Sequence, residues 1–173
     1  MSWLLELLIG AALAVMLRLF VVSLAFIRGG SMLSTLHNKD VALVWRLPYL
    51  FRAPKRGEVV ICHYPGRRMK RLPFPPQAFV KRVIGLPGDT LEWQEGVLLL
   101  NGEPLDEPYL DEAHCRYART RPPRTLGTDE YFVMGDNRDR SNDSRSVGPL
   151  RRRAIRGRLV CLLFPLKRLG RVQ

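Results

Sequence analysis

The apolar residues that follow residue 40 come in short runs separated by turn residues, and this spacing constrains the fold most. No long helical period occurs after the N-terminal segment. Gln94-Glu95-Gly96 and Asn101-Gly102 predict hairpin turns between neighbouring runs. The pattern therefore predicts a mainly β domain. The runs are Val41–Trp45, Glu58–Tyr64, Phe79–Gly85, Thr90–Trp93, Val97–Leu100, Glu130–Met134 and Arg158–Phe164.

Two segments predict loops instead. Pro65–Pro76 is basic and rich in proline, and Ala113–Arg124 is polar, basic and contains proline. We expect the second segment to be exposed.

Length and charge narrow the class of protein. The 173 residues suit one domain with an appendage, and a hydrophobic content of 46% argues against disorder. A net charge of +12 suits an anionic partner, either nucleic acid or a membrane surface. No zinc-finger spacing, RNP1 pattern or basic heptad region is found in the sequence, so we expect no nucleic-acid partner. Three cysteines leave at least one unpaired.

The N-terminal segment from Trp3 to Ile27 is almost entirely apolar, with charges at Glu6 and Arg18. The uncharged run Leu7–Leu17 covers only about 17 Å as a helix, against about 30 Å of hydrocarbon. A membrane span must therefore begin near Trp3 and end near Arg18, with both charges reaching the interfaces. We interpret residues 1–20 as a membrane anchor. A buried soluble helix is the second interpretation of this segment, and a cleaved secretory signal is the third. A strand then begins near Phe20.

A lysine lies inside one of the predicted strands. In Phe79–Ile84 the alternation places Lys81 on the same face as Phe79 and Val83. If that face is buried, the ammonium form is disfavoured and the pKa of the lysine falls. A neutral amine can act as a general base. A lysine whose stem packs while its head reaches water is the ordinary alternative.

Ser31 follows two glycines just after the apolar segment. Glycine beside a serine frees the backbone for a tight approach and can expose the serine N–H as an oxyanion donor. Gly29-Gly30-Ser31 is also common loop material.

A third stretch, Gly135–Gly148, consists almost entirely of polar residues and glycine. Three interpretations fit such a composition: a solvated loop, a Ca²⁺ site, or a hydrogen-bonded scaffold in which Asp143 pairs with Arg145. An EF-hand is excluded, because neither the glycine nor the final glutamate falls at the required place after Asp139.

In this order, the three stretches resemble the type I signal peptidases, membrane-bound serine proteases that remove signal peptides from exported proteins. The family's fold is an N-terminal transmembrane helix followed by an antiparallel β-sheet catalytic domain, here residues 21–173 on the extracytoplasmic side of the cell membrane. The matching motifs are Gly30-Ser31-Met32 with Thr35-Leu36, then Lys81–Asp89, then Gly135-Asp136-Asn137-Arg138 with Ser141, Asp143, Ser144 and Arg145.

The resemblance implies a Ser–Lys dyad, with Ser31 as the nucleophile and neutral Lys81 as the general base. It implies that Ser141 hydrogen-bonds and orients the Lys81 amine, and that Asp143 and Arg145 form a supporting ion pair. The backbone N–H of Ser31 would be one oxyanion donor. No cofactor and no metal are implied.

The sequence departs from the family pattern at two positions. Gly29 stands where some relatives carry a serine that supplies a second oxyanion donor, and Ser34 stands where proline is usual. The first change leaves the second donor unidentified, and the second loosens the turn after the nucleophile.

The substrate implied by the resemblance is a preprotein with an Ala-x-Ala signal, bound as an extended strand with alternate side chains in two shallow pockets. The excess of arginine would help the domain rest on anionic membrane lipid.

Three alternatives to a signal peptidase are a zinc site, a non-enzymatic binding domain and a self-cleaving regulator. Cys62, His63, His114 and Cys115 could suggest zinc, but neighbours on a strand point to opposite faces. A tethered, non-enzymatic basic β domain would bind nucleic acid or lipid with a steep salt dependence. A self-cleaving Ser–Lys regulator would need a DNA-binding helical domain, where this chain has an apolar segment.

Overall fold

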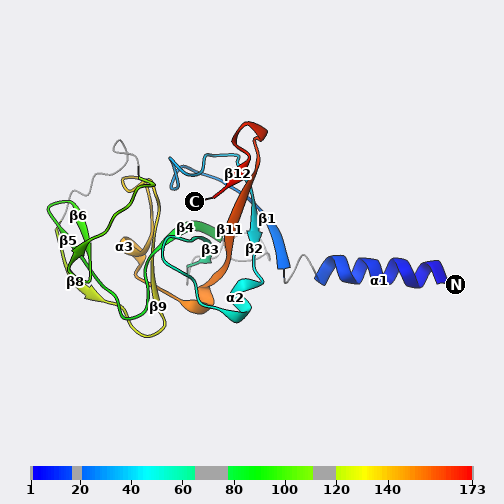
Figure 1. Ribbon diagram of the computed structural model, residues 1–173, viewed down its shortest axis with the longest axis horizontal. Coiled ribbons are helices and arrows are strands. Elements are labelled where there is room, and N and C mark those ends of the chain that lie inside the picture. The colour runs from blue at the N-terminus through cyan, green and yellow to red at the C-terminus, as the bar shows by residue number, and fades with distance from the viewer. Residues whose placement is uncertain (1, 17–20, 65–77, 111–119, 173) are drawn as a thin grey trace, which may run out of the picture.

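The computed structural model describes residues 2–16, 21–64, 78–110 and 120–172, and it contains two antiparallel sheets (Figure 1). The predictions for Pro65–Pro76, Arg18, His114 and Cys115 lie outside these residues. The helical elements are α1 (Ser2–Met16), α2 (Pro48–Phe51), α3 (Ser144–Val147), η3 (Arg152–Ala154) and η4 (Leu166–Arg168). The strands are β1 (Val22–Phe26), β2 (Val41–Trp45), β3 (Val59–His63), β4 (Ala78–Gly85), β5 (Thr90–Gln94), β6 (Val97–Leu100), β7 (Glu103–Pro104), β8 (Arg121–Thr125), β9 (Glu130–Met134), β10 (Leu150–Arg151), β11 (Ile155–Phe164) and β12 (Gly170–Arg171).

The larger sheet has the order β1-β2-β11-β3-β4-β9-β10, with β12 paired to β11. The smaller sheet has the order β7-β6-β5-β8 and lies on the side of the molecule away from α1 (Figure 1). All the strand pairs are antiparallel, which confirms the predicted class of β domain.

The predicted hairpin turns form at Glu95-Gly96 and at Asn101-Gly102. Glu95 and Gly96 have φ values of 45° and 87°, and Asn101 and Gly102 have 53° and 89°. Two consecutive residues with positive φ make the tight turn whose twist matches antiparallel strands.

The loop prediction for Ala113–Arg124 is wrong at its end, where the structure has strand β8. Residues 121–125 pair with β5, in the register Thr90↔Thr125 and Trp93↔Arg121. The strand lies at the edge of the smaller sheet, and most of its side chains are exposed. An edge strand tolerates proline and needs no apolar alternation, so its sequence looks like that of a loop.

Strand β4 joins the parts of the core. Its residues 81–85 are all buried. Val83 packs with Val60 and Cys62, whereas Ile84 packs with Leu91 and Phe132 under the smaller sheet. A third cluster, which includes Met32 and Leu36, lies under β1, β2 and β11. Both faces of β4 are therefore covered.

Helix α1 projects from the β domain, and its large apolar side chains are exposed (Figure 1). Its 15 residues correspond to about 22 Å along the helix axis. Among the residues described, no helix combines the length and the hydrophobicity needed to cross a membrane. Residues 1 and 17–20 of the predicted anchor lie outside the described part.

Candidate active site

Lys81 and Ser31 meet at the centre of the site. Lys81 lies on β4 opposite Val60 of β3, and it is 2% exposed. Its Nζ donates a hydrogen bond to Ser31 Oγ at 2.7 Å. Residues 50 positions apart are thus within reach for proton transfer.

Burial lowers the pKa of Lys81 below its ordinary value of 10.5. The cause is the loss of water around the ammonium ion, because Lys81 sits among the packed side chains of the core. The carboxylates of Asp143 and Asp136 oppose this effect only in part. The site therefore favours the neutral amine, the form that can accept a proton.

The turn that carries Ser31 is fixed by its own apolar residues. Met32 and Leu36 are 2% and 1% exposed and belong to the core beneath the turn. The Leu36 N–H donates to Met32 O at 2.7 Å. Gly29 has φ +91°, and its N–H donates to Asn38 Oδ1 at 3.2 Å. The hydroxyl of Ser31 is therefore presented by a turn that is held on both sides.

Ser34 has a φ of 79°, a conformation that proline cannot adopt because its ring holds φ near about −65°. Its hydroxyl donates to Tyr109 O at 3.0 Å. The backbone turn at this position is therefore one that proline could not form.

The polar stretch after β9 is an interior scaffold rather than a solvated loop. Asp136, Asn137, Arg138, Asp143 and Ser144 are each at most 3% exposed. Each buried polar group needs a partner, and these residues find theirs in neighbouring strands, in Gly135 and Arg145 of the same stretch, and in the Ser31 turn.

Two contacts tie this scaffold to Ser31. The Asn137 N–H donates to Ser31 O at 3.1 Å. A Cβ on Gly135 would lie 2.3 Å from the same carbonyl oxygen, so only glycine allows this approach. The scaffold therefore touches the backbone of Ser31 directly.

Asp143 and Arg145 form the predicted ion pair, with Arg145 Nη2 2.8 Å from Asp143 Oδ2. Asp143 also accepts the Gly135 N–H at 3.0 Å. Burial acts to raise the pKa of Asp143, but the hydrogen bonds and the positive charge of Arg145 lower it overall. Asp143 is therefore ionised and links Arg145 to the start of the scaffold.

Ser141 lies beside the scaffold, with its Oγ buried against Gly135. The Oγ makes no well-formed hydrogen bond within the described chain, although its hydroxyl contributes to the lowered pKa of Asp143. The hydrogen bond of Lys81 goes to Ser31. The orienting role of Ser141 stays a prediction.

Sequence reasoning missed several residues that hold the site together. Arg82 donates to Thr35 Oγ1 and pairs with Asp136, and its guanidinium lies 3.8 Å from the centre of the Tyr109 ring. Arg138 pairs with Glu107 at 2.5 Å. The available signal was the placement of a second cation, Arg82, inside an otherwise apolar strand.

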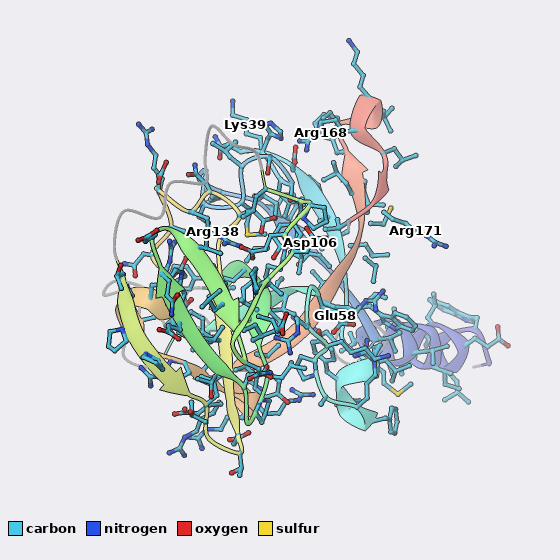
Figure 2. The ribbon with its side chains drawn as sticks, turned by 60° about the vertical axis from the view of Figure 1, so that its left-hand side comes forward. Lys39, Glu58, Asp106, Arg138, Arg168 and Arg171 are labelled. Carbon is cyan, nitrogen blue, oxygen red and sulfur yellow. The ribbon has the colours of Figure 1, made fainter. Side chains whose placement is uncertain are left out.

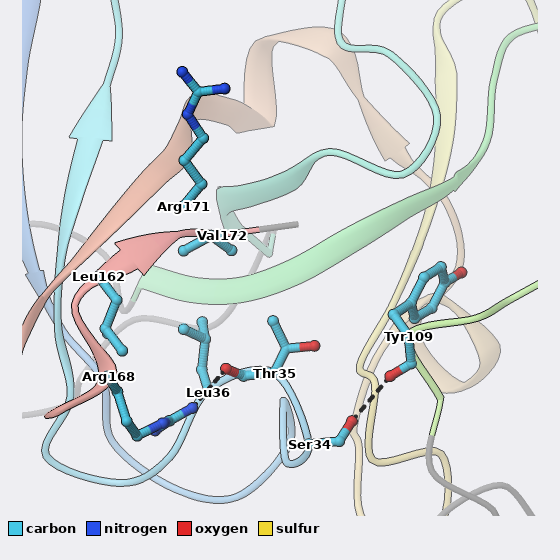
Figure 3. A pocket seen from close by; sticks show the side chains of 8 residues that line it. All are labelled: Ser34, Thr35, Leu36, Tyr109, Leu162, Arg168, Arg171 and Val172. Atoms are coloured by element: carbon cyan, nitrogen blue, oxygen red, sulfur yellow. Dashed lines mark hydrogen bonds between the residues drawn. The ribbon is translucent and has the colours of Figure 1, made fainter.

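A cavity of about 340 Å³ lies beside the segment just after Ser31, where Ser34, Thr35 and Leu36 line it (Figure 3). Leu36, Leu162 and the Arg168 side chain line it. Arg168 donates to Thr35 O at 2.9 Å and pairs with Asp40 at 2.7 Å. The C-terminal segment therefore holds the residues that follow Ser31 through the contacts of Arg168.

Metal ligands are not grouped in the described residues: no three His, Cys, Asp or Glu side chains there are placed to hold an ion. His37 is exposed and His63 is half-buried. Cys62 is fully buried, and burial raises the pKa of its thiol to about 12.

Comparison with known proteins identifies the family. Residues 1–164 match the family described as signal peptidase, peptidase S26. The chain belongs to the signal peptidase family. It is 37% identical to signal peptidase I of Leptolyngbya laminosa over 162 residues, which cover 94% of this chain and 78% of the relative. It is 31% identical to signal peptidase I of Bacillus licheniformis over 172 residues, covering 95% and 88%.

The fold also matches this family. A crystal structure of a signal peptidase I from Enterococcus faecalis is similar, with a TM-score of 0.52 and 31% identity. The match covers 63% of this chain and 98% of that one. By family the chain is a peptidase, and the Ser31–Lys81 pair lies in its β domain.

Proposed function

We propose that this chain is a membrane-anchored serine endopeptidase that removes N-terminal signal peptides from exported preproteins. Ser31 is the nucleophile and Lys81 the general base. The observation that carries the proposal is the 2.7 Å hydrogen bond between Lys81 Nζ and Ser31 Oγ, made by a buried lysine whose pKa is lowered. Relatives named signal peptidase I, matched over almost the whole chain, support the substrate class.

In the acylation step, Ser31 Oγ bonds to the scissile carbonyl carbon while its proton passes to the Lys81 amine. The carbonyl π electrons move to the oxygen, and the Ser31 backbone N–H stabilises that charge. The tetrahedral intermediate collapses as the C–N bond breaks, and Lys81 donates its proton to the leaving amine. Water, activated by the same amine, then hydrolyses the acyl ester and releases the signal peptide.

The supporting residues act through the dyad. Ser141 orients the Lys81 amine in this proposal through its buried hydroxyl, which has no other well-formed hydrogen bond in the described chain. The Asp143–Arg145 pair keeps the scaffold in place beside Ser31, because Asp143 accepts the N–H of Gly135.

The substrate is a preprotein with an Ala-x-Ala signal, bound as an added strand with small side chains in two shallow pockets. Ile61 and Val80 support this placement, since both are half-buried and pack against the core cluster beneath the Ser31 turn. A shallow apolar surface of this kind suits alanine side chains.

The anchor is residues 1–20, with a single pass through the cell membrane and the β domain on the extracytoplasmic side. Exposed apolar side chains outside α1 support contact with lipid, because Leu24, Phe26 and Trp45 are 54%, 70% and 39% exposed. The register Val22↔Trp45 places these three on one face of the β1–β2 pair, directly after the anchor. Anionic lipid suits the net charge of +12.

The test is cleavage of a preprotein by the full chain in detergent or vesicles. Ser31→Ala and Lys81→Ala should each abolish cleavage while thermal unfolding stays cooperative. Ser146→Ala and Lys167→Ala change the same residue types at exposed positions and should cleave normally. Cleavage retained by both dyad variants would reject the dyad.

The anchor has a separate test. The full chain should float with vesicles that contain phosphatidylglycerol, and a chain that begins at residue 21 should float less. Equal flotation of the two chains would contradict an anchor at residues 1–20. Binding to nucleic acid that is indifferent to Ser31→Ala, without any cleavage, would favour the non-enzymatic alternative.

A further inference from the structure

The side chain of Asn137 is buried against the turn that carries Ser31. It is 1% exposed, and its Nδ2 donates to Gly30 O at 3.0 Å. Its Oδ1 accepts the Arg140 N–H at 3.2 Å, which fixes the carboxamide with the NH₂ end toward Gly30. The Asn137 N–H holds Ser31 O. One residue thus holds the carbonyl oxygens on both sides of the Ser31 α-carbon.

This arrangement fixes the direction of the Ser31 N–H. In a planar trans peptide, the C=O and the N–H point to opposite sides. Since the Gly30 carbonyl is held toward the scaffold, the Ser31 N–H must point away from the scaffold. It donates no hydrogen bond to any described residue, so it is free to meet a ligand.

We propose that Asn137 is a positioning residue for the oxyanion site, aiming the Ser31 N–H at the oxygen of the scissile carbonyl. The proposal rests on the proposed function. Gly29 offers no side-chain donor, so the Ser31 N–H is the donor that the site visibly presents, and its direction decides how well charge on the oxygen is stabilised. A preorganised donor stabilises the transition state because it needs no reorientation as charge develops.

The Ser31 N–H stabilises the transition state more than the bound substrate. The oxygen is neutral in the bound substrate and becomes negative only when the Ser31 Oγ–carbon bond forms. A misaimed N–H therefore lowers kcat and leaves KM almost unchanged. Replacing Asn137 by an uncharged residue also leaves the pKa of Lys81 unchanged, because Asn137 carries no charge and makes no hydrogen bond to the Lys81 amine.

The test uses Asn137→Asp in the full chain. Aspartate keeps the size of the side chain and the acceptor for the Arg140 N–H, but it turns an oxygen toward Gly30 O. We expect kcat to fall by about 10²–10³-fold, the loss typical of one oxyanion donor, with KM within about threefold. For Asn137→Ala, which adds no charge, the pH at which kcat/KM reaches half its maximum should not move. Gln94→Glu makes the same amide-to-acid change at an exposed position of β5, in the smaller sheet, and should keep the wild-type kcat.

A peptide aldehyde ending in alanine gives a second readout. Ser31 Oγ adds to the aldehyde carbon, and the former carbonyl oxygen then occupies the oxyanion site. Its inhibition constant should rise by the same factor by which kcat falls. If Asn137→Asp fails to fold, Asn137→Ala removes the donor without adding charge and carries the same expectations.

The outcomes separate the two proposals. Wild-type kcat in the Asn137 variants, with Ser31→Ala inactive, would overturn this inference alone. So would a loss that appears in KM, or a pH profile that moves in Asn137→Ala, because that is the behaviour of a merely structural residue. Cleavage that survives both Ser31→Ala and Lys81→Ala would overturn the proposed function instead.

Discussion

Arg82 and Asp136 form a two-point ion pair inside the molecule, with Nε 2.9 Å from Oδ1 and Nη2 2.7 Å from Oδ2. The side chains are 2% and 0% exposed. Arg82 follows Lys81 on β4, and Asp136 precedes Asn137 in the scaffold, so the pair joins the strand of Lys81 to the loop that holds Ser31. Thr35 Oγ1 adds a third member by donating to Asp136 at 2.5 Å.

The first prediction concerns this pair. Arg82→Met should lower the free energy of unfolding by about 3–5 kcal/mol, because it leaves the Asp136 carboxylate buried without its partner. Arg82→Met combined with Asp136→Asn should recover part of that loss, since no charge then remains buried. Urea unfolding monitored by tryptophan fluorescence measures both. Arg171→Met, at an exposed arginine, is the control, and equal stabilities for it and Arg82→Met would contradict the prediction.

Much of the fold could be predicted because local patterns and tertiary packing agree. Glu130–Met134 is apolar enough to be recognised as a strand, and its bounds are those of β9. Asn101-Gly102 determines its own turn through the positive φ of both residues. Strand β8 could not be found, because an exposed edge strand is held by backbone hydrogen bonds that leave no mark on the pattern of side chains.

Only the part of the site that lies in recognisable sequence motifs could be predicted. Ser31 and Lys81 were found from motifs, and the structure brings them together. The burial of Asp136 and Asn137 was not predictable from composition, since a run of polar residues normally indicates solvent. Their partners, Arg82 and Gly30, lie far away in the sequence and become neighbours only in the folded chain.

The second prediction concerns the turn after the nucleophile. Ser34→Pro, a change toward the residue usual in the family, should be strongly destabilising here, because φ at this position is 79°. Ser34→Gly should stay within about 1 kcal/mol of the wild type, since relief of the left-handed backbone offsets the lost hydrogen bond to Tyr109 O. Thermal unfolding distinguishes the two variants. A proline variant as stable and active as the glycine variant would show that the turn adopts another conformation.

The third prediction concerns the close approach at Gly135. Gly135→Ala should cost at least about 1–3 kcal/mol, because the new Cβ would lie 2.3 Å from Ser31 O and from Ser141 Oγ. Since one of these atoms belongs to the backbone of the nucleophile, kcat should fall as well. Gly127→Ala is the matched control, with its nearest contact at an ordinary 3.5 Å. Equal activity of the two variants would mean that the scaffold does not press on Ser31.

The fourth prediction concerns acid stability and Glu58, which lies near α2 (Figure 2). Burial acts to raise the pKa of Glu58, but hydrogen bonds from Arg52, the Lys55 N–H and Tyr49 lower it from 4.5 to about 2. The unfolded chain therefore binds more protons in this range, and the stability that Glu58 contributes is lost as the pH falls from 4.5 to about 2. Glu58→Gln should be less stable by about 1.5–3 kcal/mol at neutral pH, and the difference should shrink across that window. Glu103→Gln, at an exposed glutamate, should show no such trend.

The last prediction links the chemistry of Lys81 to the stability of the fold. Its pKa in the folded chain is lowered from 10.5 by burial, so between the folded value and 10.5 the unfolded chain binds more protons. The free energy of unfolding should therefore rise with pH in that window, relative to Lys81→Met, which has no charge to bury. The kcat/KM of the wild type should rise with pH through the folded pKa of Lys81, because only the neutral amine accepts the proton of Ser31. In calorimetry and preprotein cleavage across the same pH series, the pH at which the rate reaches half its maximum should match the pH at which the stability difference begins to rise, below 10.5. A rate midpoint without a matching change in stability would assign the titration to a group other than this lysine.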